Sequence, residues 1–311
     1  MNNSRNSTSI VNDRTLHFAG GDGTELAGSL RLPSAEGRTF PGVLLVAGSG
    51  PTDRNGNNPL SARRLDTLKL IAERLAEAQI ASLRFDKRGV GASTVAPRDV
   101  EAKARFFRWD NAIHDVVAAH GALSDQPTVD VHCTGLLGHS EGGLLALAAA
   151  PRTRDAPRGI VLAATPGRPL GHIIRRQVAR RHPSLLAEVE HGLAEIGATG
   201  RPPSATAMTR LFPPYIGPYL QHAMAFDPVE ALTAVDAKCL LVQGAADRQV
   251  VPMDDIQPMV DVLTGGRPDS DILIAPSVCH ALHRASSREG DPRLAPVVAD
   301  GISSWLRANL I

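Results

Sequence analysis

The stretch GHSEGG at residues 138–143 constrains the fold of this chain more than any other part of the sequence. Residues 131–137 before it are largely apolar and predict a short buried strand, and residues 144–150 after it favour a buried helix. A glycine-flanked serine between a strand and a helix is the pattern of a nucleophile elbow. The pattern places the Ser140 hydroxyl above the sheet and at a helix N-terminus, where the helix dipole favours negative charge.

Gly138 and Gly142 fit this interpretation, because the backbone turns so sharply at Ser140 that larger side chains two positions away would clash. The alternative is an ordinary strand-to-helix turn in which Ser140 caps the helix. The strand and helix around the motif favour the elbow, because they are the context that the motif requires.

Strand and helix patterns alternate along most of the chain. Apolar runs predict strands at residues 16–18, 26–32, 42–47, 80–85, 131–137, 159–164, 239–244 and 272–274. Helical spacing predicts helices over residues 65–78, 102–123 and 295–310. This alternation is typical of a mostly parallel central sheet with helices on both faces.

The alternation stops at residue 166, and from there to residue 226 the chain has the pattern of helices broken by prolines, without a buried strand. We therefore predict one core domain, residues 1–165 and 227–311, with an inserted helical cap at residues 166–226. An insertion at this place lies above the carboxyl ends of the strands, so we expect the cap to cover Ser140. Residues 1 to about 12 are predicted to form a frayed polar tail.

Composition excludes several classes of protein. A net charge of +1 gives no sign of the basic surface that binds nucleic acid or an anionic membrane. Three widely spaced cysteines, Cys133, Cys239 and Cys279, suit neither disulfides nor zinc and favour free thiols in a reducing compartment. The N-terminal residues lack the apolar segment of a signal peptide, and no apolar run approaches the roughly 20 residues that span a bilayer. We therefore expect a soluble, cytoplasmic protein.

A serine nucleophile needs a base and a carboxylate that orients the base. Asp247 and His280 each follow a predicted strand, and loops at the carboxyl ends of parallel strands converge on one rim. We therefore predict Asp247 as the acid and His280 as the base. The alternative acids, Asp254 and Asp255, have the pattern of a first helical turn, and His283 is the alternative base.

Attack on an ester carbonyl creates an oxyanion, which preorganised N–H groups must stabilise. The first predicted donor is the backbone N–H of Glu141, the residue after the nucleophile. The second is the backbone N–H of Ser49, with Gly50 as the alternative. Gly48 and Gly50 allow the backbone to approach a substrate closely, although a plain glycine-rich turn would have the same composition.

Four stretches together resemble the bacterial α/β-hydrolase family of esterases and serine aminopeptidase-like hydrolases. They are GHSEGG, GSGPTDRNGN, RFDKRGVGAS and FDPVEALTAVDAKCLLVQGAADRQVVP, and the similarity runs from about residue 26 to the C-terminus. The resemblance implies an α/β-hydrolase fold, with Ser140, Asp247 and His280 as nucleophile, acid and base. The longer H-G-G-G oxyanion motif of one branch is absent. Residues 86–89 invite a phosphate-binding interpretation, but they lack the P-loop pattern and are better explained as shaping the loop beside the elbow.

These observations predict a cofactor-free serine hydrolase with no metal, most simply a carboxylesterase acting on small acyl esters through an acyl-enzyme. A peptidase, thioesterase or acyltransferase of the same fold is the alternative, and so is a non-catalytic ligand-binding member. The expected partner is a small-molecule ester, with neither nucleic acid nor membrane, and a homo-oligomer is left open.

Four of the eleven aromatic side chains gather in the predicted cap, among them Phe212, Tyr215 and Tyr219. We predict that these three line an apolar substrate pocket; the alternative is that they anchor the cap to the core. A basic cluster, Arg175, Arg176, Arg180 and Arg181, could attract anionic substrates, but the pattern favours a solvated helix face.

Overall fold

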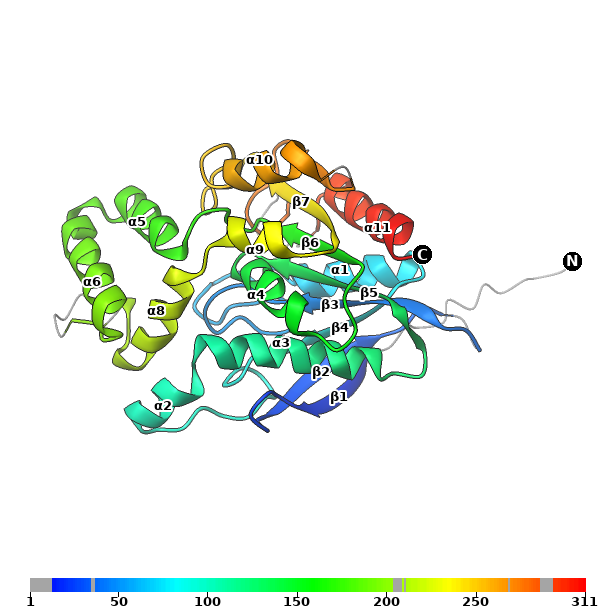
Figure 1. Cartoon of the computed structure of the whole chain (residues 1–311), viewed down its shortest axis with the longest axis horizontal. Coiled ribbons are helices and arrows are strands. Elements are labelled where there is room, and N and C mark those ends of the chain that lie inside the picture. Colours follow the sequence, from blue (N-terminus) through cyan, green and yellow to red (C-terminus); the bar gives the residue numbers. More distant parts are fainter. Residues whose placement is uncertain (1–12, 35–36, 204–208, 210, 268, 286–292) are drawn as a thin grey trace, which may run out of the picture.

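Eight strands form one sheet among the residues that the computed structural model describes, which are 13–34, 37–203, 209, 211–267, 269–285 and 293–311. The strands are β1 (Arg14–Ala19), β2 (Glu25–Arg31), β3 (Phe40–Val46), β4 (Ala81–Phe85), β5 (Val129–His139), β6 (Gly159–Ala163), β7 (Lys238–Gly244) and β8 (Asp271–Ala275). Their order in the sheet is β1-β2-β4-β3-β5-β6-β7-β8 (Figure 1). The pairs β1–β2 and β2–β4 are antiparallel and all others are parallel, so the predicted mostly parallel sheet is confirmed.

Helices cover both faces of this sheet, also as predicted. They are α1 (Thr67–Glu77), α2 (Val100–Phe106), α3 (Trp109–Ser124), α4 (Glu141–Ala149), α5 (Leu170–Arg181), α6 (Leu186–Thr199), α8 (Gly217–Ala225), α9 (Pro228–Ala234), α10 (Gln257–Gly266) and α11 (Pro296–Leu310). Side chains of α1 and α11 share one apolar cluster, and those of α3, α4, α9 and α10 share the cluster on the opposite face. Among the described helices, none combines the length and the apolar character needed to cross a membrane.

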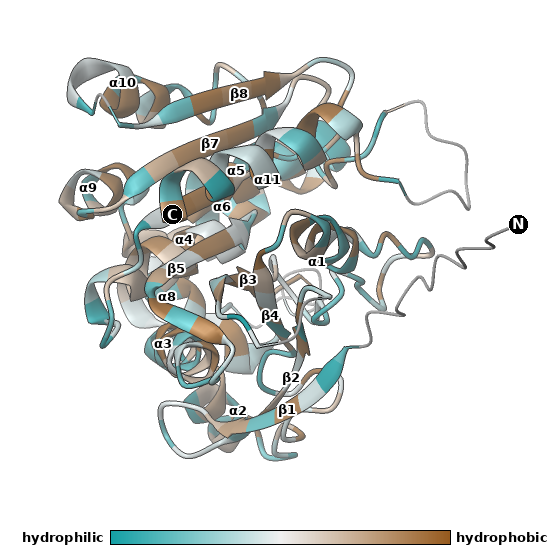
Figure 2. Cartoon of the chain, turned by 90° about the vertical axis from the view of Figure 1, so that its right-hand side faces the viewer, coloured by the Kyte–Doolittle hydropathy of each residue, from teal (hydrophilic) through white to brown (hydrophobic). Residues whose placement is uncertain are grey.

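The central strand β3 joins the two apolar clusters. Leu44 and Val46 belong to one cluster, whereas Val43 and Leu45 belong to the other. Successive side chains of a strand point to opposite faces, so a strand buried on both sides must be apolar throughout. Farther along the sheet, strands β7 and β8 are largely hydrophobic as well (Figure 2). The buried centre of the sheet is a rigid base for the loops at its carboxyl edge.

One predicted element is wrong in detail. The single helix expected over residues 102–123 is two helices, α2 and α3, because the backbone is non-helical at Phe107 and extended at Arg108. The Asn111 amide donates hydrogen bonds to the carbonyl oxygens of Arg105 and Phe106, which satisfies groups at the end of α2. The Phe107 ring packs against Tyr215 from a distant part of the chain, with the ring centroids 5.6 Å apart. This tertiary contact is invisible to a helical pattern.

The segment between β6 and β7 is helical, and no strand occurs in the part of residues 166–226 that the structure describes. Helices α5, α6 and α8 lie together at one side of the molecule (Figure 1). They share a small apolar core of their own, formed by Val178, Val189, Leu193, Ile196, Phe212 and Leu220. The predicted domain boundaries at residues 166 and 226 stay a prediction, and the predicted tail at residues 1–12 lies outside the described residues.

Candidate active site

The serine of the GHSEGG stretch lies at the junction of β5 and α4. Ser140 has φ 56° and ψ −125°, and its backbone N–H donates to the Ala163 carbonyl at 2.8 Å. A Cβ atom on Gly138 would lie 2.3 Å from the Gly142 carbonyl oxygen, which is the clash that the sequence predicted. A Cβ on Gly142 would instead lie 2.3 Å from the Val46 oxygen, so the constraint on this glycine comes from the end of β3.

The structure brings Ser140, His280 and Asp247 together in one hydrogen-bonded row. The Ser140 Oγ lies 3.1 Å from the His280 Nε2, and the His280 Nδ1 lies 2.8 Å from the Asp247 Oδ2. The three side chains come from the ends of β5, β7 and β8, whose parallel carboxyl ends share one edge of the sheet. This is the geometry in which a histidine accepts a serine proton while a carboxylate fixes its tautomer.

The Asp247 carboxylate is held by four hydrogen-bond donors. Its Oδ1 accepts from the backbone N–H groups of Gln249 at 2.7 Å and Val250 at 3.1 Å. Its Oδ2 accepts from the Gln243 amide at 3.0 Å and faces His280. Burial acts to raise the pKa of Asp247, but the hydrogen bonds from His280 and from the backbone outweigh it, and the pKa lies below its usual value. The group is therefore a stable carboxylate.

His283, the alternative base, occupies a different position. Its side chain is buried, and its Nε2 lies 3.5 Å from the Thr67 Oγ1 on α1. Its carbonyl oxygen accepts from the Cys279 backbone N–H at 2.9 Å, which closes the turn that carries His280. His283 thus shapes the turn, and His280 is the histidine that contacts Ser140.

Asp254 and Asp255, the alternative acids, are also occupied elsewhere. They precede α10, which begins at Gln257, so the prediction that they form its first turn is wrong. The Arg176 guanidinium on α5 bonds Asp254 at 2.8 Å and Asp255 at 3.1 Å. Arg176 is therefore not part of a solvated helix face, because it ties α5 to the loop after β7.

The predicted oxyanion loop lies directly beside the serine. A Cβ on Gly48 would come within 3.3 Å of the Ser140 Cβ. Among the described residues, the backbone N–H groups of Ser49 and Glu141 have no acceptor within the protein, as two oxyanion donors require. Gly50 has φ +69°, a value that favours glycine.

Lys87, which the sequence analysis assigned no individual role, holds this loop. Its Nζ donates to the carbonyl oxygen of Gly48 and, at 2.8 Å, to that of Gly50. Because a trans peptide unit points its C=O and N–H in opposite directions, fixing the Gly48 carbonyl turns the Ser49 N–H away from Lys87. The lysine therefore sets the direction of the predicted donor.

The neighbouring segment at residues 86–93 supports the same loop. The buried Asp86 carboxylate accepts from the Arg54 backbone N–H at 2.8 Å, from the Arg54 guanidinium at 2.7 Å and from the Ala92 N–H at 2.9 Å. Burial acts to raise the pKa of Asp86, but the bonds from Arg54 and Ala92 lower it below its usual value. These contacts support the loop-shaping interpretation of this segment over phosphate binding.

His139 is a site residue that the sequence analysis missed. Its Nε2 lies 2.8 Å from the His280 carbonyl oxygen, and the two rings lie 5.0 Å apart. A carbonyl only accepts, so Nε2 carries the proton. Burial, and then the neighbouring His280, lower the pKa of His139 to about 4. Its position beside the nucleophile was the available signal, although that position alone does not predict a partner.

The Glu141 side chain also has a role that the sequence analysis did not assign. It is buried, near both Lys87 and Tyr219 of α8. Burial lowers the pKa of Lys87, and the Glu141 carboxylate partly offsets this. Burial, followed by the same carboxylate, raises the pKa of Tyr219. A cation is therefore placed close to a buried anion at the predicted oxyanion site.

The predicted pocket rings have packing partners. Phe212 lies in the apolar core of the helical segment, and Tyr215 packs against Phe107 with Lys103 Nζ 5.2 Å from its ring centroid. Tyr219 contacts Trp109 of α3, with the ring centroids 5.5 Å apart. These contacts support the alternative, in which Phe212 and Tyr215 anchor the helical segment. Tyr219 alone of the three also reaches the elbow, through Glu141.

Comparisons with known proteins agree with this architecture. The family model for serine aminopeptidase, S33, matches residues 63–195. Esterase EstD of Thermotoga maritima is 27% identical over 296 residues, which cover 90% of this chain but 65% of the relative.

Two solved structures show the same fold at low identity. The Pyrococcus furiosus esterase PF2001 has a TM-score of 0.63 and 13% identity, over 97% of this chain and 92% of that one. The α/β hydrolase GrgF from Penicillium sp. has a TM-score of 0.61 and 18% identity, over 96% and 99% of the two chains. With its eight-stranded, mostly parallel sheet and its serine elbow, the chain has the α/β-hydrolase fold and is similar to esterases of that fold.

Proposed function

We propose that this protein is a serine ester hydrolase, a carboxylesterase that acts on small acyl esters. The observation that carries the proposal is the row of hydrogen bonds from Ser140 through His280 to Asp247, at 3.1 Å and 2.8 Å. The 27% identity to an esterase supports the same class of substrate.

In the proposed reaction the Ser140 Oγ attacks the acyl carbon while His280 Nε2 takes its proton. Asp247 holds the Nδ1–H of His280 and stabilises the imidazolium that forms. The Ser49 and Glu141 N–H groups receive the oxyanion, and His280 then protonates the leaving alcohol. Water that is activated by His280 releases the acid from the acyl-enzyme and restores Ser140.

A peptidase is the second candidate, because the matching family model describes serine aminopeptidases. An aminopeptidase must bind a free α-ammonium group, which calls for an unpaired carboxylate near the serine. Asp254 and Asp255, which follow the proposed acid along the chain, are instead bonded to Arg176. This pairing removes Asp254 and Asp255 as candidates for that carboxylate.

The experiment combines covalent labelling with turnover. A fluorophosphonate should label the wild-type protein, and p-nitrophenyl acetate and butyrate should be hydrolysed. Ser140→Ala should abolish labelling and lower kcat on the order of 10⁴-fold, with an unchanged circular dichroism spectrum. Retention of near-normal hydrolysis by folded Ser140→Ala would refute the proposal. Faster turnover of aminoacyl p-nitroanilides than of esters would favour the peptidase.

A further inference from the structure

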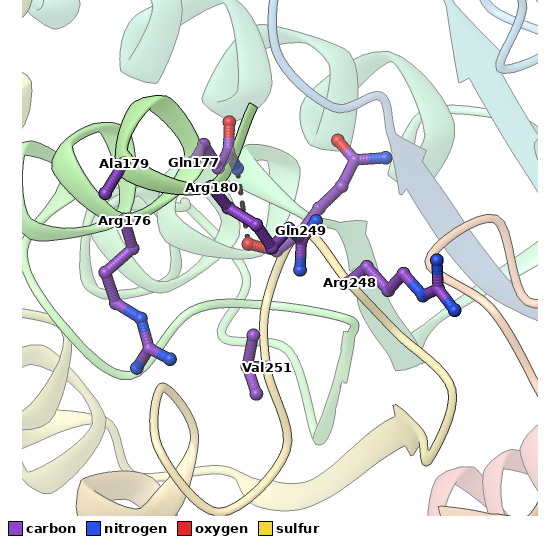
Figure 3. Close-up of a pocket in the computed structure, with 7 residues that line it drawn as sticks. All are labelled: Arg176, Gln177, Ala179, Arg180, Arg248, Gln249 and Val251. Atoms are coloured by element: carbon purple, nitrogen blue, oxygen red, sulfur yellow. Dashed lines mark hydrogen bonds between the residues drawn. The ribbon is translucent and has the colours of Figure 1, made fainter. Parts of the chain in front are cut away.

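A cavity of about 310 Å³ lies between α5 and the loop that follows β7 (Figure 3). It is lined by Arg176, Gln177, Ala179 and Arg180 of α5 and by Arg248, Gln249 and Val251 of the loop. The same loop begins with the proposed acid Asp247, which accepts the Gln249 N–H at 2.7 Å. The cavity thus adjoins the segment that carries the acid, and its volume is at the lower end of the about 300–1,000 Å³ of small-molecule pockets.

The lining of this cavity is strongly cationic. Three of its seven residues are arginines and none is acidic. Arg176 is neutralised by Asp254 and Asp255. In contrast, the exposed side chains of Arg180 and Arg248 have no hydrogen bond or ion pair with any residue that the structure describes. Two guanidinium groups are therefore free to bind a ligand.

The two free arginines come from opposite walls of the cavity. In Figure 3, Arg180 extends from α5 towards the loop at Gln249, whereas Arg248 extends from the loop on the side away from α5. The walls are tied together, because the Gln177 amide donates to the Gln249 carbonyl at 3.3 Å and Arg176 bonds the acids farther along the loop. A cavity whose walls are already joined loses little conformational entropy when a ligand binds.

The electrostatic surroundings favour an anion. The whole chain has a net charge of +1, so the arginines on α5 and its flanks make a local positive region. Burial lowers the pKa of His172 on α5; Arg168, Arg176 and Arg175 lower it further, and Asp255 raises it. An anionic group that enters this region gains Coulomb energy that a neutral group does not.

We propose that this cavity binds the free carboxylate of an ester substrate that carries a second acid group, through Arg180 and Arg248. A guanidinium is matched to a carboxylate in both charge and geometry. Ala179 and Val251 provide apolar surface for the aliphatic chain that links the carboxylate to the ester. The inference rests on the proposed esterase activity, and the apolar pocket that the sequence predicted stays a prediction.

The test uses matched substrates that differ only in charge. The mono-p-nitrophenyl esters of adipic and suberic acid are compared with the same compounds in which the free carboxylate is methylated. We expect the charged form to have about tenfold higher kcat/KM for at least one chain length, and the preference to weaken in about 0.5 M salt. A preference for the methylated form at both lengths would overturn the proposal.

Three variants locate the preference. Arg180→Gln and Arg248→Gln should each reduce the ratio of the two kcat/KM values several-fold. Arg181→Gln, on the same helix but outside the cavity lining, should leave it unchanged. We compare this ratio because a change at Arg248 that disturbs the neighbouring Asp247 would alter kcat/KM for both substrates equally and would leave their ratio unchanged. The assignment would be overturned if the ratio of the two kcat/KM values were unchanged in both Arg180→Gln and Arg248→Gln. It would also be overturned if Arg181→Gln lowered this ratio as much as they do.

A binding measurement separates this inference from the proposed function. Adipate and suberate should raise the melting temperature of the wild-type protein, and of Ser140→Ala, by several degrees at millimolar concentration, but not that of the Arg180→Gln, Arg248→Gln double variant. If no ester is hydrolysed but these diacids bind through the two arginines, the proposed function fails and the site stands. If esters are hydrolysed without diacid binding or a charge preference, the site fails alone.

Discussion

His139 Nε2 donates a hydrogen bond of 2.8 Å to the backbone carbonyl of His280. The bond joins the residue before the proposed nucleophile to the residue proposed as its base, across 141 positions of the chain. It supports the His280 turn from the side of the elbow, whereas Asp247 holds the imidazole from the other. The half-buried His139 thus links the elbow directly to the turn that carries His280.

Loss of this bond should affect catalysis more than binding. We expect His139→Ala to lower kcat about tenfold with a smaller change in KM, because a misplaced base loses rate in the chemical step. His139→Gln retains a donor amide and should recover part of the loss. Equal kcat values for the wild type and His139→Ala in steady-state assays would show that the bond does not position the base.

The two neighbouring histidines should differ in severity. His280→Ala should match Ser140→Ala in its loss of kcat, because residues that act as one unit are non-additive. His283→Ala should lower kcat far less and lower the melting temperature more, since His283 is buried against Thr67. Measurement of kcat and melting temperature for both variants decides the order. A larger loss of kcat in His283→Ala than in His280→Ala would show that His283 is the base.

Lys87 should act through the loop that it holds. Lys87→Met removes the donor to the Gly48 and Gly50 carbonyls, so the Ser49 N–H is free to turn. We expect about a tenfold loss in kcat, a fraction of the roughly 10²–10³ that removal of an oxyanion donor costs. Lys87→Arg should restore part of it. A higher KM with an unchanged kcat would instead indicate that Lys87 contacts the substrate.

Tyr215 should contribute to stability and not to substrate choice. Tyr215→Ala removes the ring that packs on Phe107 and beneath Lys103, and should lower the free energy of unfolding by about 1–2 kcal/mol. The ratio of kcat/KM for acetyl and hexanoyl esters should not change, and Tyr215→Phe should preserve both properties. If Tyr215→Ala changed the ratio of kcat/KM values but not the free energy of unfolding, the ring would line the substrate pocket.

His120 should make the protein less stable in acid. Its side chain is buried with Nε2 3.1 Å from the Thr134 hydroxyl, and burial lowers its pKa to about 4. The folded state therefore excludes a proton that the unfolded chain takes up below about pH 6.5, so stability is complete above that pH and falls towards pH 4.

The matching experiment is urea denaturation at pH 7 and pH 5. His120→Gln should lose about 2 kcal/mol less than the wild type between the two values, since glutamine does not titrate. His132→Gln provides the control, because His132 is exposed. An unchanged difference between pH 7 and pH 5 in His120→Gln would show that His120 titrates normally in the folded protein.

Local patterns in the sequence predicted the sheet, the elbow and the residues that meet at it. Buried parallel strands must be apolar along their length, and the sharp turn at Ser140 requires glycine at position 138, so both inferences rest on local patterns. The glycine at position 142 is required by a distant contact, the end of β3. Asp247 and His280 followed from the same logic, because parallel strands end at one edge. The sequence left His283 open as the alternative base, and only the tertiary contacts of the two histidines distinguish them.

The tertiary structure alone decided what surrounds those residues. Three contacts join segments that lie far apart in the sequence. They are the hydrogen bond from His139 to His280, the hydrogen bond from Lys87 to the Gly48 carbonyl and the ion pair of Arg176 with Asp254. The break between α2 and α3, which lies at Phe107, has the same origin in a distant ring. Such contacts depend on how loops and helices pack around the sheet, and packing leaves no periodicity in the sequence.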